Sequence, residues 1–348
     1  MDLNFFCKEL PKIELHAHLN GSLSQATMLQ LQRYYVDAGI SDKTNTFLDE
    51  FQIGAGDTRN LSECFQVFSI AHSLTSTSEA LVMATELTLQ EFQEDGCCYI
   101  ELRSTPRDTQ YITKKQYIDS IIRAMEKPSI NLSIISKLII SINRASQLQE
   151  VEEIADIAIE RHKIHPDTVV GIELSGNPAV GNFGDFIPAL NRARQSGLKV
   201  TLHCGEVCNP EEVLEMLNFK PERIGHGVCI HPKYGGTEET WIALCQSKIP
   251  VEVCLTSNVN TKITPDYESH HFKELIEAGL PVVLCTDDKG VFATSLSQEY
   301  RLCAESFGLT RIQVAKLSLD AAQYIFSEAN IRELIIGKIL KFMNDYAS

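Results

Sequence analysis

The chain has 348 residues, of which 44% are hydrophobic and 22% are charged, and its formal net charge is −15. A chain of this size can bury a large core, as one large α/β domain or as two smaller ones. The acidic balance excludes a broad basic surface, so neither nucleic acid polymers nor anionic membranes are expected partners.

The first predicted element is a strand that ends at Leu15-His16-Ala17-His18. Two residues of separation on a strand place both imidazoles on one face. Such a pair either holds a divalent metal ion or consists of ordinary surface or core histidines, and only distant partners distinguish the two cases.

Helical patterns without intervening strands follow over about residues 24–95, with Ser24 as a candidate N-cap and Gly96 as a candidate C-cap glycine. They include a predicted helix over 61–74. No Pro/Gly/Ser-rich linker bounds this region. We therefore expect a helical cap inserted after the first strand, within a single domain that spans residues 1–348.

From Cys97 onward, apolar runs alternate with helical patterns. Counting the first strand, the sequence predicts eight strands, which implies parallel strands with right-handed crossovers. Eight of them favour a closed (β/α)8 TIM-type barrel over an open doubly wound sheet. The remainder, Ser295–Tyr346, is expected to form C-terminal helices on the outside. The later predicted strands are Cys97–Arg103, Leu132–Ile142, Val169–Leu174, Lys199–His203, Arg223–His226, Pro250–Leu255 and Pro281–Thr286.

Polar residues stand at the ends of four predicted strands. In a barrel of this type, the carboxyl ends of the strands carry the catalytic groups. Three histidines and one aspartate suit Zn²⁺ and leave room for a water molecule, which would be the nucleophile. The alternative is a set of salt bridges and hydrogen-bonded histidines at the barrel mouth. These strand-end residues are His16, His18, His203, His226, Asp287 and Asp288, and Glu206 follows His203 closely.

Two of these residues suit proton transfer. Glu206 lies three residues beyond a proposed ligand, where its carboxyl can reach a substrate as a general acid. His226 either orients the nucleophile or accepts its proton.

Four segments together resemble the signatures of the adenosine/AMP deaminase family, in the family's order and over nearly the whole chain. The resemblance implies a zinc-dependent enzyme that hydrolytically removes an amine from the six position of a purine. The four segments are Leu15–Gly21, His203–Glu206, Arg223–Gly227 and Thr286–Asp288.

The resemblance also implies roles for the matching residues. Glu206 would be the proton shuttle to the purine ring, and His226 would lie beside the attacking hydroxide. Asp288 would bind the imidazole-ring edge of the purine, and Gly176 would offer its backbone N–H. One zinc ion would be held by His16, His18, His203 and Asp287.

Departures from ordinary adenosine deaminases make the chain similar to the adenosine deaminase-like branch, whose members convert N6-methyl-AMP to IMP and methylamine. Asn20 stands where adenosine deaminases carry Asp, and it would not repel a 5′-phosphate. Arg107, in Ser104-Thr105-Pro106-Arg107, suits bidentate phosphate binding, or else bridges a surface carboxylate. Lys289 is either a rim charge or a solvated loop residue.

Two further residues face the expected ribose and phosphate. His72 is either a contact or a plain helix residue. Asn143 replaces the Asp usual in this branch, so it can bond a ribose hydroxyl only without charge assistance. The expected substrate contacts are His18, Asn20, His72, Ser104, Thr105, Pro106, Arg107, Asn143, Gly176 and Asp288.

Two alternatives remain. An adenosine or adenine deaminase would share the metal site and release ammonia, and a non-catalytic member would bind a nucleotide or a protein partner.

Eleven scattered cysteines favour reduced thiols, and no leader-like or membrane-spanning apolar run is present. We therefore expect a cytoplasmic protein, and the strong negative charge favours a monomer.

Overall fold

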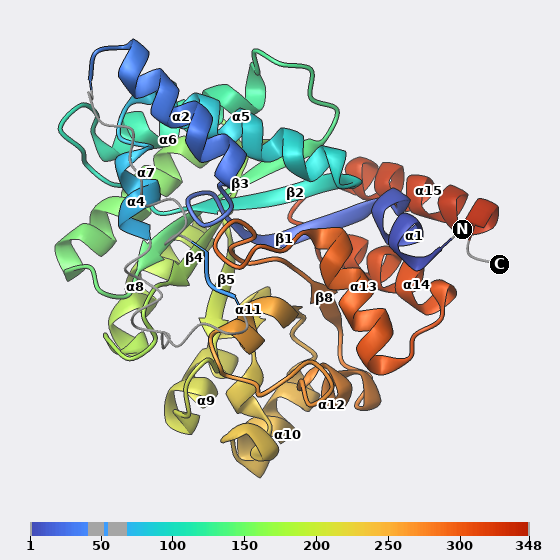
Figure 1. Ribbon diagram of the computed structural model, residues 1–348. Helices are drawn as coiled ribbons and strands as arrows, with labels where there is room; N and C mark the ends of the chain where they lie inside the picture. The colour runs from blue at the N-terminus through green and yellow to red at the C-terminus, as the bar shows by residue number, and fades with distance from the viewer. Residues whose placement is uncertain (1, 41–51, 55–67, 347–348) are drawn as a thin grey trace.

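The computed structural model describes residues 2–40, 52–54 and 68–346, and its centre is a parallel sheet of eight strands whose spatial order follows the chain. A bridge between Ala17 and Asp287 brings the end of the last strand back to the first (Figure 1). The predicted (β/α)8 barrel is therefore confirmed. The strands are β1 (Lys12–His18), β2 (Cys97–Ser104), β3 (Ile135–Asn143), β4 (Val169–Ser175), β5 (Lys199–Cys204), β6 (Arg223–His226), β7 (Val251–Val253) and β8 (Val282–Leu284).

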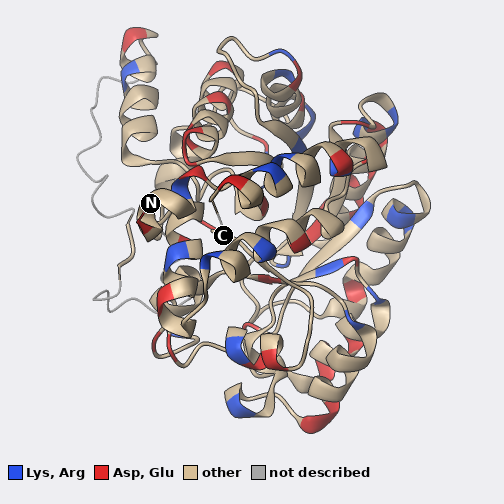
Figure 2. Ribbon diagram, turned by 90° about the vertical axis from the view of Figure 1, so that its right-hand side faces the viewer, with Lys and Arg blue, Asp and Glu red and all other residues tan. Residues whose placement is uncertain are grey.

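Helices on the outside connect the strands. Thr113 and Thr237 each form a reciprocal capping box with the third helical residue, which satisfies backbone N–H groups at the helix start. Acidic and basic residues are interspersed along the outer helices in Figure 2. These helices are α6 (Lys114–Glu126), α7 (Leu148–Ile164), α8 (Phe183–Gln195), α9 (Pro210–Phe219), α10 (Glu238–Ser247) and α12 (Phe272–Glu277), with short 3₁₀ turns at η3 (Val228–Ile230) and η4 (Pro232–Tyr234).

The described part of the predicted cap contains three helices, and residues 52–54 within it lie outside them. Ser24 is the N-cap of its first helix, as expected, because its hydroxyl accepts a hydrogen bond from Thr27 N at 3.1 Å. The predicted helix over 61–74 is described only from residue 68, and its earlier part lies outside the described residues. The cap helices are α2 (Gln25–Asp37), α4 (Phe68–Ser73) and α5 (Ser78–Glu94).

The C-terminal helices cover the barrel as expected, and they pack against an N-terminal helix that was not predicted. In α1 (Leu3–Glu9), Phe6 lies 5.3 Å from Phe342, ring centre to ring centre. Among the described helices, none has the length and apolarity needed to cross a membrane. The C-terminal elements are α13 (Leu296–Phe307), α14 (Arg311–Ala321), η5 (Ala322–Tyr324) and α15 (Ala329–Tyr346).

Three predicted strands are longer than the observed ones, and one of them, Pro281–Thr286, forms a strand only over Val282–Leu284. The run Pro250–Leu255 forms a strand only as far as Val253, and a helix, α11 (Leu255–Asn260), begins at its last residue. A short apolar run does not distinguish a buried strand from the start of a buried helix. β3 begins at Ile135 rather than Leu132, since Gln93 Oε1 accepts the backbone N–H of Ile134 at 3.0 Å.

Candidate active site

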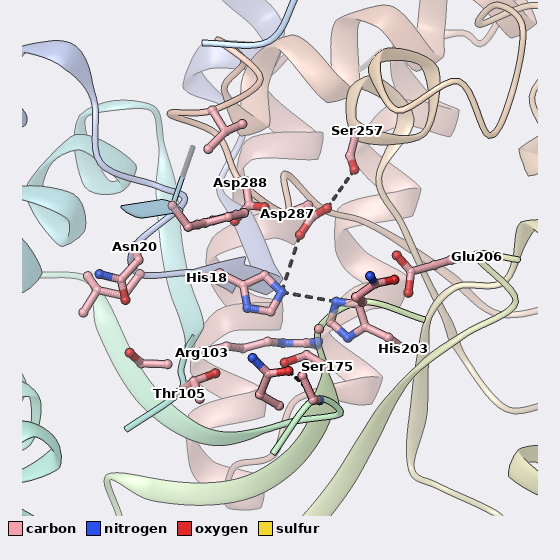
Figure 3. Close-up of a pocket in the computed structure, with 18 of the residues that line it drawn as sticks. His18, Asn20, Arg103, Thr105, Ser175, His203, Glu206, Ser257, Asp287 and Asp288 are labelled. Atoms are coloured by element: carbon pink, nitrogen blue, oxygen red, sulfur yellow. Dashed lines mark hydrogen bonds and ion pairs between the residues drawn. The ribbon is translucent and has the colours of Figure 1, made fainter. Parts of the chain in front are cut away.

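A cavity of about 510 Å³ opens at the carboxyl ends of the strands, between the barrel and the cap (Figure 3). Every predicted site residue except one lines it. The exception is His16, which is fully buried. The predicted residues around the cavity are His18, Asn20, His72, Ser104, Thr105, Pro106, Arg107, Asn143, Gly176, His203, Glu206, His226, Asp287 and Asp288.

The four predicted metal ligands come together at the floor of this cavity. Their ligand atoms all lie within 4.8 Å of one another. Asp287 Oδ1 is 3.4 Å from His16 Nε2 and 3.5 Å from His18 Nε2. His18 Nε2 is also 3.3 Å from His203 Nε2. Among the described residues His16 Nε2 has no hydrogen-bond partner although it is buried, so this donor set fits a divalent cation.

Three further side chains hold these ligands in place. Glu252 Oε2 lies 2.8 Å from His16 Nδ1, and Glu173 Oε1 lies 2.9 Å from His203 Nδ1. Ser257 Oγ donates to Asp287 Oδ2 at 2.7 Å. Histidines that bind metals commonly bond a carboxylate through their other ring nitrogen, and this contact fixes the ring's orientation.

A buried arginine joins the two supporting carboxylates. Arg103 donates to Glu173 Oε1 at 2.8 Å and to Glu252 Oε2 at 2.5 Å, and all three side chains are fully buried. Burial alone would raise the pKa of Glu173 and of Glu252, but the Arg103 charge beside them lowers both well below the usual range. Both carboxylates therefore stay charged beneath the histidines.

We expect Arg103→Met to destabilise the fold by about 3–5 kcal/mol, because it removes the arginine that pairs with buried Glu173 and one of the two that pair with buried Glu252. The matched control is Arg192→Met, which removes an arginine that pairs with Glu152 and Asp156 at the surface. The control should cost about 0–1 kcal/mol. Urea unfolding of both variants measures the difference, and equal losses would contradict the role given to Arg103.

The two predicted proton-transfer residues lie beside the four ligands. Glu206 Oε1 is 3.7 Å from His226 Nε2, which is 4.0 Å from Asp287 Oδ2. Burial raises the pKa of Glu206, which suits a group that must hold a proton near neutral pH. His226 and Asp287 have φ values of 64° and 60°, a left-handed conformation that is rare for such residues and is found at functional sites.

Asp288 follows one ligand and faces the cavity. Burial and then the adjacent Asp287 raise the pKa of Asp288 well above its usual range. A protonated carboxyl can donate a hydrogen bond to a ring nitrogen. A Cβ on Gly21 would come within 1.7 Å of Asp288 Oδ1, so only glycine fits at that position.

On the cap side of the cavity, Asn20 and Arg107 share neutral partners. Asn20 Oδ1 accepts from Tyr117 Oη at 2.9 Å, and its Nδ2 donates to Thr75 Oγ1 at 2.9 Å. Arg107 Nη2 donates to Thr75 Oγ1 at 2.5 Å and to the carbonyl oxygen of His72 at 3.1 Å. The described hydrogen-bond partners of Arg107 are all uncharged, so its positive charge is not neutralised by them.

Three other predicted residues have specific surroundings. Asn143 Oδ1 accepts from the backbone N–H of Ala145 at 2.9 Å. Gly176 has a φ of 98°, and a Cβ there would come within 2.5 Å of Asn143 Oδ1. Both interpretations of Lys289 were wrong, because it is only 9% exposed and forms an ion pair with Glu91 of the cap.

Several residues around the site were not predicted. Glu173, Glu252 and Arg103 are charged residues inside predominantly apolar strands, and that pattern was the available signal for them. Ser257 stands in a helix that the sequence did not predict. The unpredicted cavity walls include Phe68, Ser175, Asn177, Thr261, Ile263, Val291 and Phe292.

Comparison with known proteins agrees with this geometry. The family model described as adenosine deaminase matches residues 11–342. The N6-methyl-AMP deaminase of Bos taurus is 43% identical over 326 residues, covering 92% of this chain and 91% of its own. The solved structure of Arabidopsis ADAL complexed with IMP superposes with a TM-score of 0.87 at 35% identity, covering 98% of this chain and 99% of that one.

A more distant structure shares the fold alone. It is a Burkholderia ambifaria amidohydrolase with bound Zn, with a TM-score of 0.82 at 20% identity, which covers 98% of this chain and 94% of its own. The family assignment rests on the family model and the closer relatives, which span nearly the whole chain. The chain belongs to the adenosine deaminase family.

Proposed function

We propose that the protein is a zinc-dependent aminohydrolase that converts N6-methyl-AMP and water into IMP and methylamine. The observation that carries the proposal is one cavity with four candidate metal ligands and Glu206 at its floor and with Arg107 at its cap side, where the hydrogen-bond partners of Arg107 among the described residues are uncharged. The name of the bovine relative and the IMP bound to the Arabidopsis structure support this choice of substrate and product.

One zinc ion fits the four clustered donors, because three imidazoles and one carboxylate form a nitrogen and oxygen set that zinc prefers. Bound Zn in the Burkholderia structure, which has the same fold, is consistent with this choice. When bound, zinc supplies a hydroxide nucleophile at neutral pH by lowering the pKa of a water molecule.

The chain's own side chains manage the protons and the purine. Glu206, whose raised pKa favours the protonated form, donates a proton to the purine ring nitrogen beside the reacting carbon. Asp288 donates a hydrogen bond to the imidazole-ring edge of the base, and Gly176 offers its backbone N–H.

The barrel and its cap act as one domain, since residues of both line the cavity.

Arg107 is the proposed partner of the 5′-phosphate. We expect Arg107→Ala to raise KM for N6-methyl-AMP by about 10-fold or more, as when a charge-assisted contact worth roughly 1.5–3 kcal/mol is lost. Arg107 also donates a hydrogen bond to Thr75 of the cap. Loss of this contact in Arg107→Ala should change KM for nucleotide and nucleoside equally. The nucleoside N6-methyladenosine is therefore the control, and equal increases in KM for nucleotide and nucleoside would reject the phosphate role.

The experiment that tests the function is an assay of four compounds with the purified, zinc-loaded protein. Adenosine, AMP, N6-methyladenosine and N6-methyl-AMP are supplied separately, and the purine ultraviolet spectrum is followed. Conversion of N6-methyl-AMP in strong preference to the other three supports the proposal. Preferred conversion of adenosine would identify an ordinary adenosine deaminase, and no conversion of any compound would favour a non-catalytic member.

A further inference from the structure

A chain of buried hydrogen bonds leads from a backbone amide in α12 to His226. The backbone N–H of Phe272 donates to His270 Nδ1 at 3.2 Å. His270 Nε2 lies 3.1 Å from Asn258 Oδ1, and Asn258 Nδ2 lies 3.0 Å from His226 Nδ1. His270 and Asn258 are fully buried and His226 is 2% exposed, so water does not compete for these contacts.

The donor and the acceptor of every hydrogen bond in this series follow from the first donor, the backbone N–H of Phe272. A backbone N–H can only donate, so His270 Nδ1 must be an unprotonated acceptor. The ring proton of His270 is then on Nε2, and the atom that faces it on Asn258 must be the amide oxygen. Burial lowers the pKa of His270 well below its usual range, which agrees with a neutral ring.

The amide of Asn258 also determines which nitrogen of His226 accepts a hydrogen bond. With its oxygen turned to His270, Asn258 presents its amide N–H to His226 Nδ1, which must therefore be an acceptor as well. A second contact fixes the backbone of this residue, since His271 Nε2 lies 2.7 Å from the carbonyl oxygen of His226.

We infer that Asn258 and His270 are positioning residues that hold His226 as the neutral tautomer with its proton on Nε2. That N–H points toward the space between Glu206 Oε1, at 3.7 Å, and Asp287 Oδ2, at 4.0 Å. Among the described residues Nε2 has no hydrogen-bond partner, so its proton is available to a water molecule there.

This assignment decides between the two roles left open for His226. A ring nitrogen that already carries a proton donates a hydrogen bond to the oxygen of the attacking water and cannot take its proton. Glu206, once it has given its own proton to the purine ring, is then the group that accepts the proton from water. This consequence rests on the proposed function, whereas the tautomer itself does not.

The test is nitrogen NMR of the zinc-loaded protein with ¹⁵N-labelled histidine, with His226→Gln used to assign its resonances among the ten histidines. In the wild type, His226 Nδ1 is expected in the range of an unprotonated nitrogen and Nε2 in that of a protonated one. In Asn258→Asp, a carboxylate replaces the donor, and the proton is expected on Nδ1. A protonated Nδ1 in the wild type overturns the inference.

Kinetics provides the second readout. Asn258→Asp should lower kcat by about 10²-fold with a smaller change in KM, because the wrong tautomer removes a donor that acts on the reacting water. The matched control is Asn260→Asp on the same helix, whose amide donates to the carbonyl oxygen of Ile53, outside this chain of bonds. The control buries the same carboxylate and should leave the His226 resonances unchanged.

The outcomes separate this inference from the proposed function. If the wild type converts none of the four purines but shows the expected resonances, the tautomer assignment survives and the proposed function fails. If Asn258→Asp leaves Nδ1 unprotonated, or shifts the His226 resonances no more than Asn260→Asp does, Asn258 does not position His226 and the inference is wrong.

Discussion

Replacing Glu206 by Gln should lower kcat by about 10²–10⁴-fold while zinc remains bound, as expected when a general acid and base is removed. Gln keeps the size of the side chain and can still donate a hydrogen bond, but it cannot exchange a proton at neutral pH. Glu206 contributes none of the four clustered donors, so metal content by elemental analysis should match the wild type.

The control for this variant is Glu211→Gln, in the first turn of α9 and exposed to solvent. It removes a nearby carboxylate that does not line the cavity and should leave kcat unchanged. Turnover of Glu206→Gln close to that of the wild type would exclude Glu206 from proton transfer.

Replacing His203 by Ala should abolish both zinc retention and turnover. The variant removes one of the four converging donors and leaves Glu173 without the ring it orients, so the loss exceeds that of a single contact. Zinc per chain after dialysis, measured by elemental analysis, checks the expectation.

The matched control is His165→Ala, at the end of α7, where the ring pairs with Glu126 outside the cavity. It should retain one zinc ion per chain. Full zinc occupancy in His203→Ala would show that the ion binds elsewhere or that three donors suffice.

The barrel and the cluster of four candidate ligands were predictable because strand periodicity and chain order determine them. Parallel strands that alternate with helices place all carboxyl ends on one side, so His16, His203 and Asp287 had to lie near one another. The structure confirms that these residues meet at one point. The family resemblance added the roles of the residues, and those remain proposals.

The supporting residues were not predictable by the same reasoning. Glu173 and Glu252 appear in the sequence as single charges within apolar strands, and only the closed barrel shows which histidine each one meets. Asn258 lies in α11, a helix that the sequence did not predict and that begins at the last residue of a predicted strand. Lys289 pairs with Glu91 of the cap, 198 positions away in the sequence. The local pattern of residue types does not predict contacts over such a sequence separation.

The most direct test of hydrolytic deamination is turnover of N6-methyl-AMP in ¹⁸O-labelled water by the zinc-loaded protein. We expect one labelled oxygen in each IMP formed and one methylamine released with it, because the oxygen that replaces the amine comes from water. IMP without the label, or no release of methylamine, would contradict it.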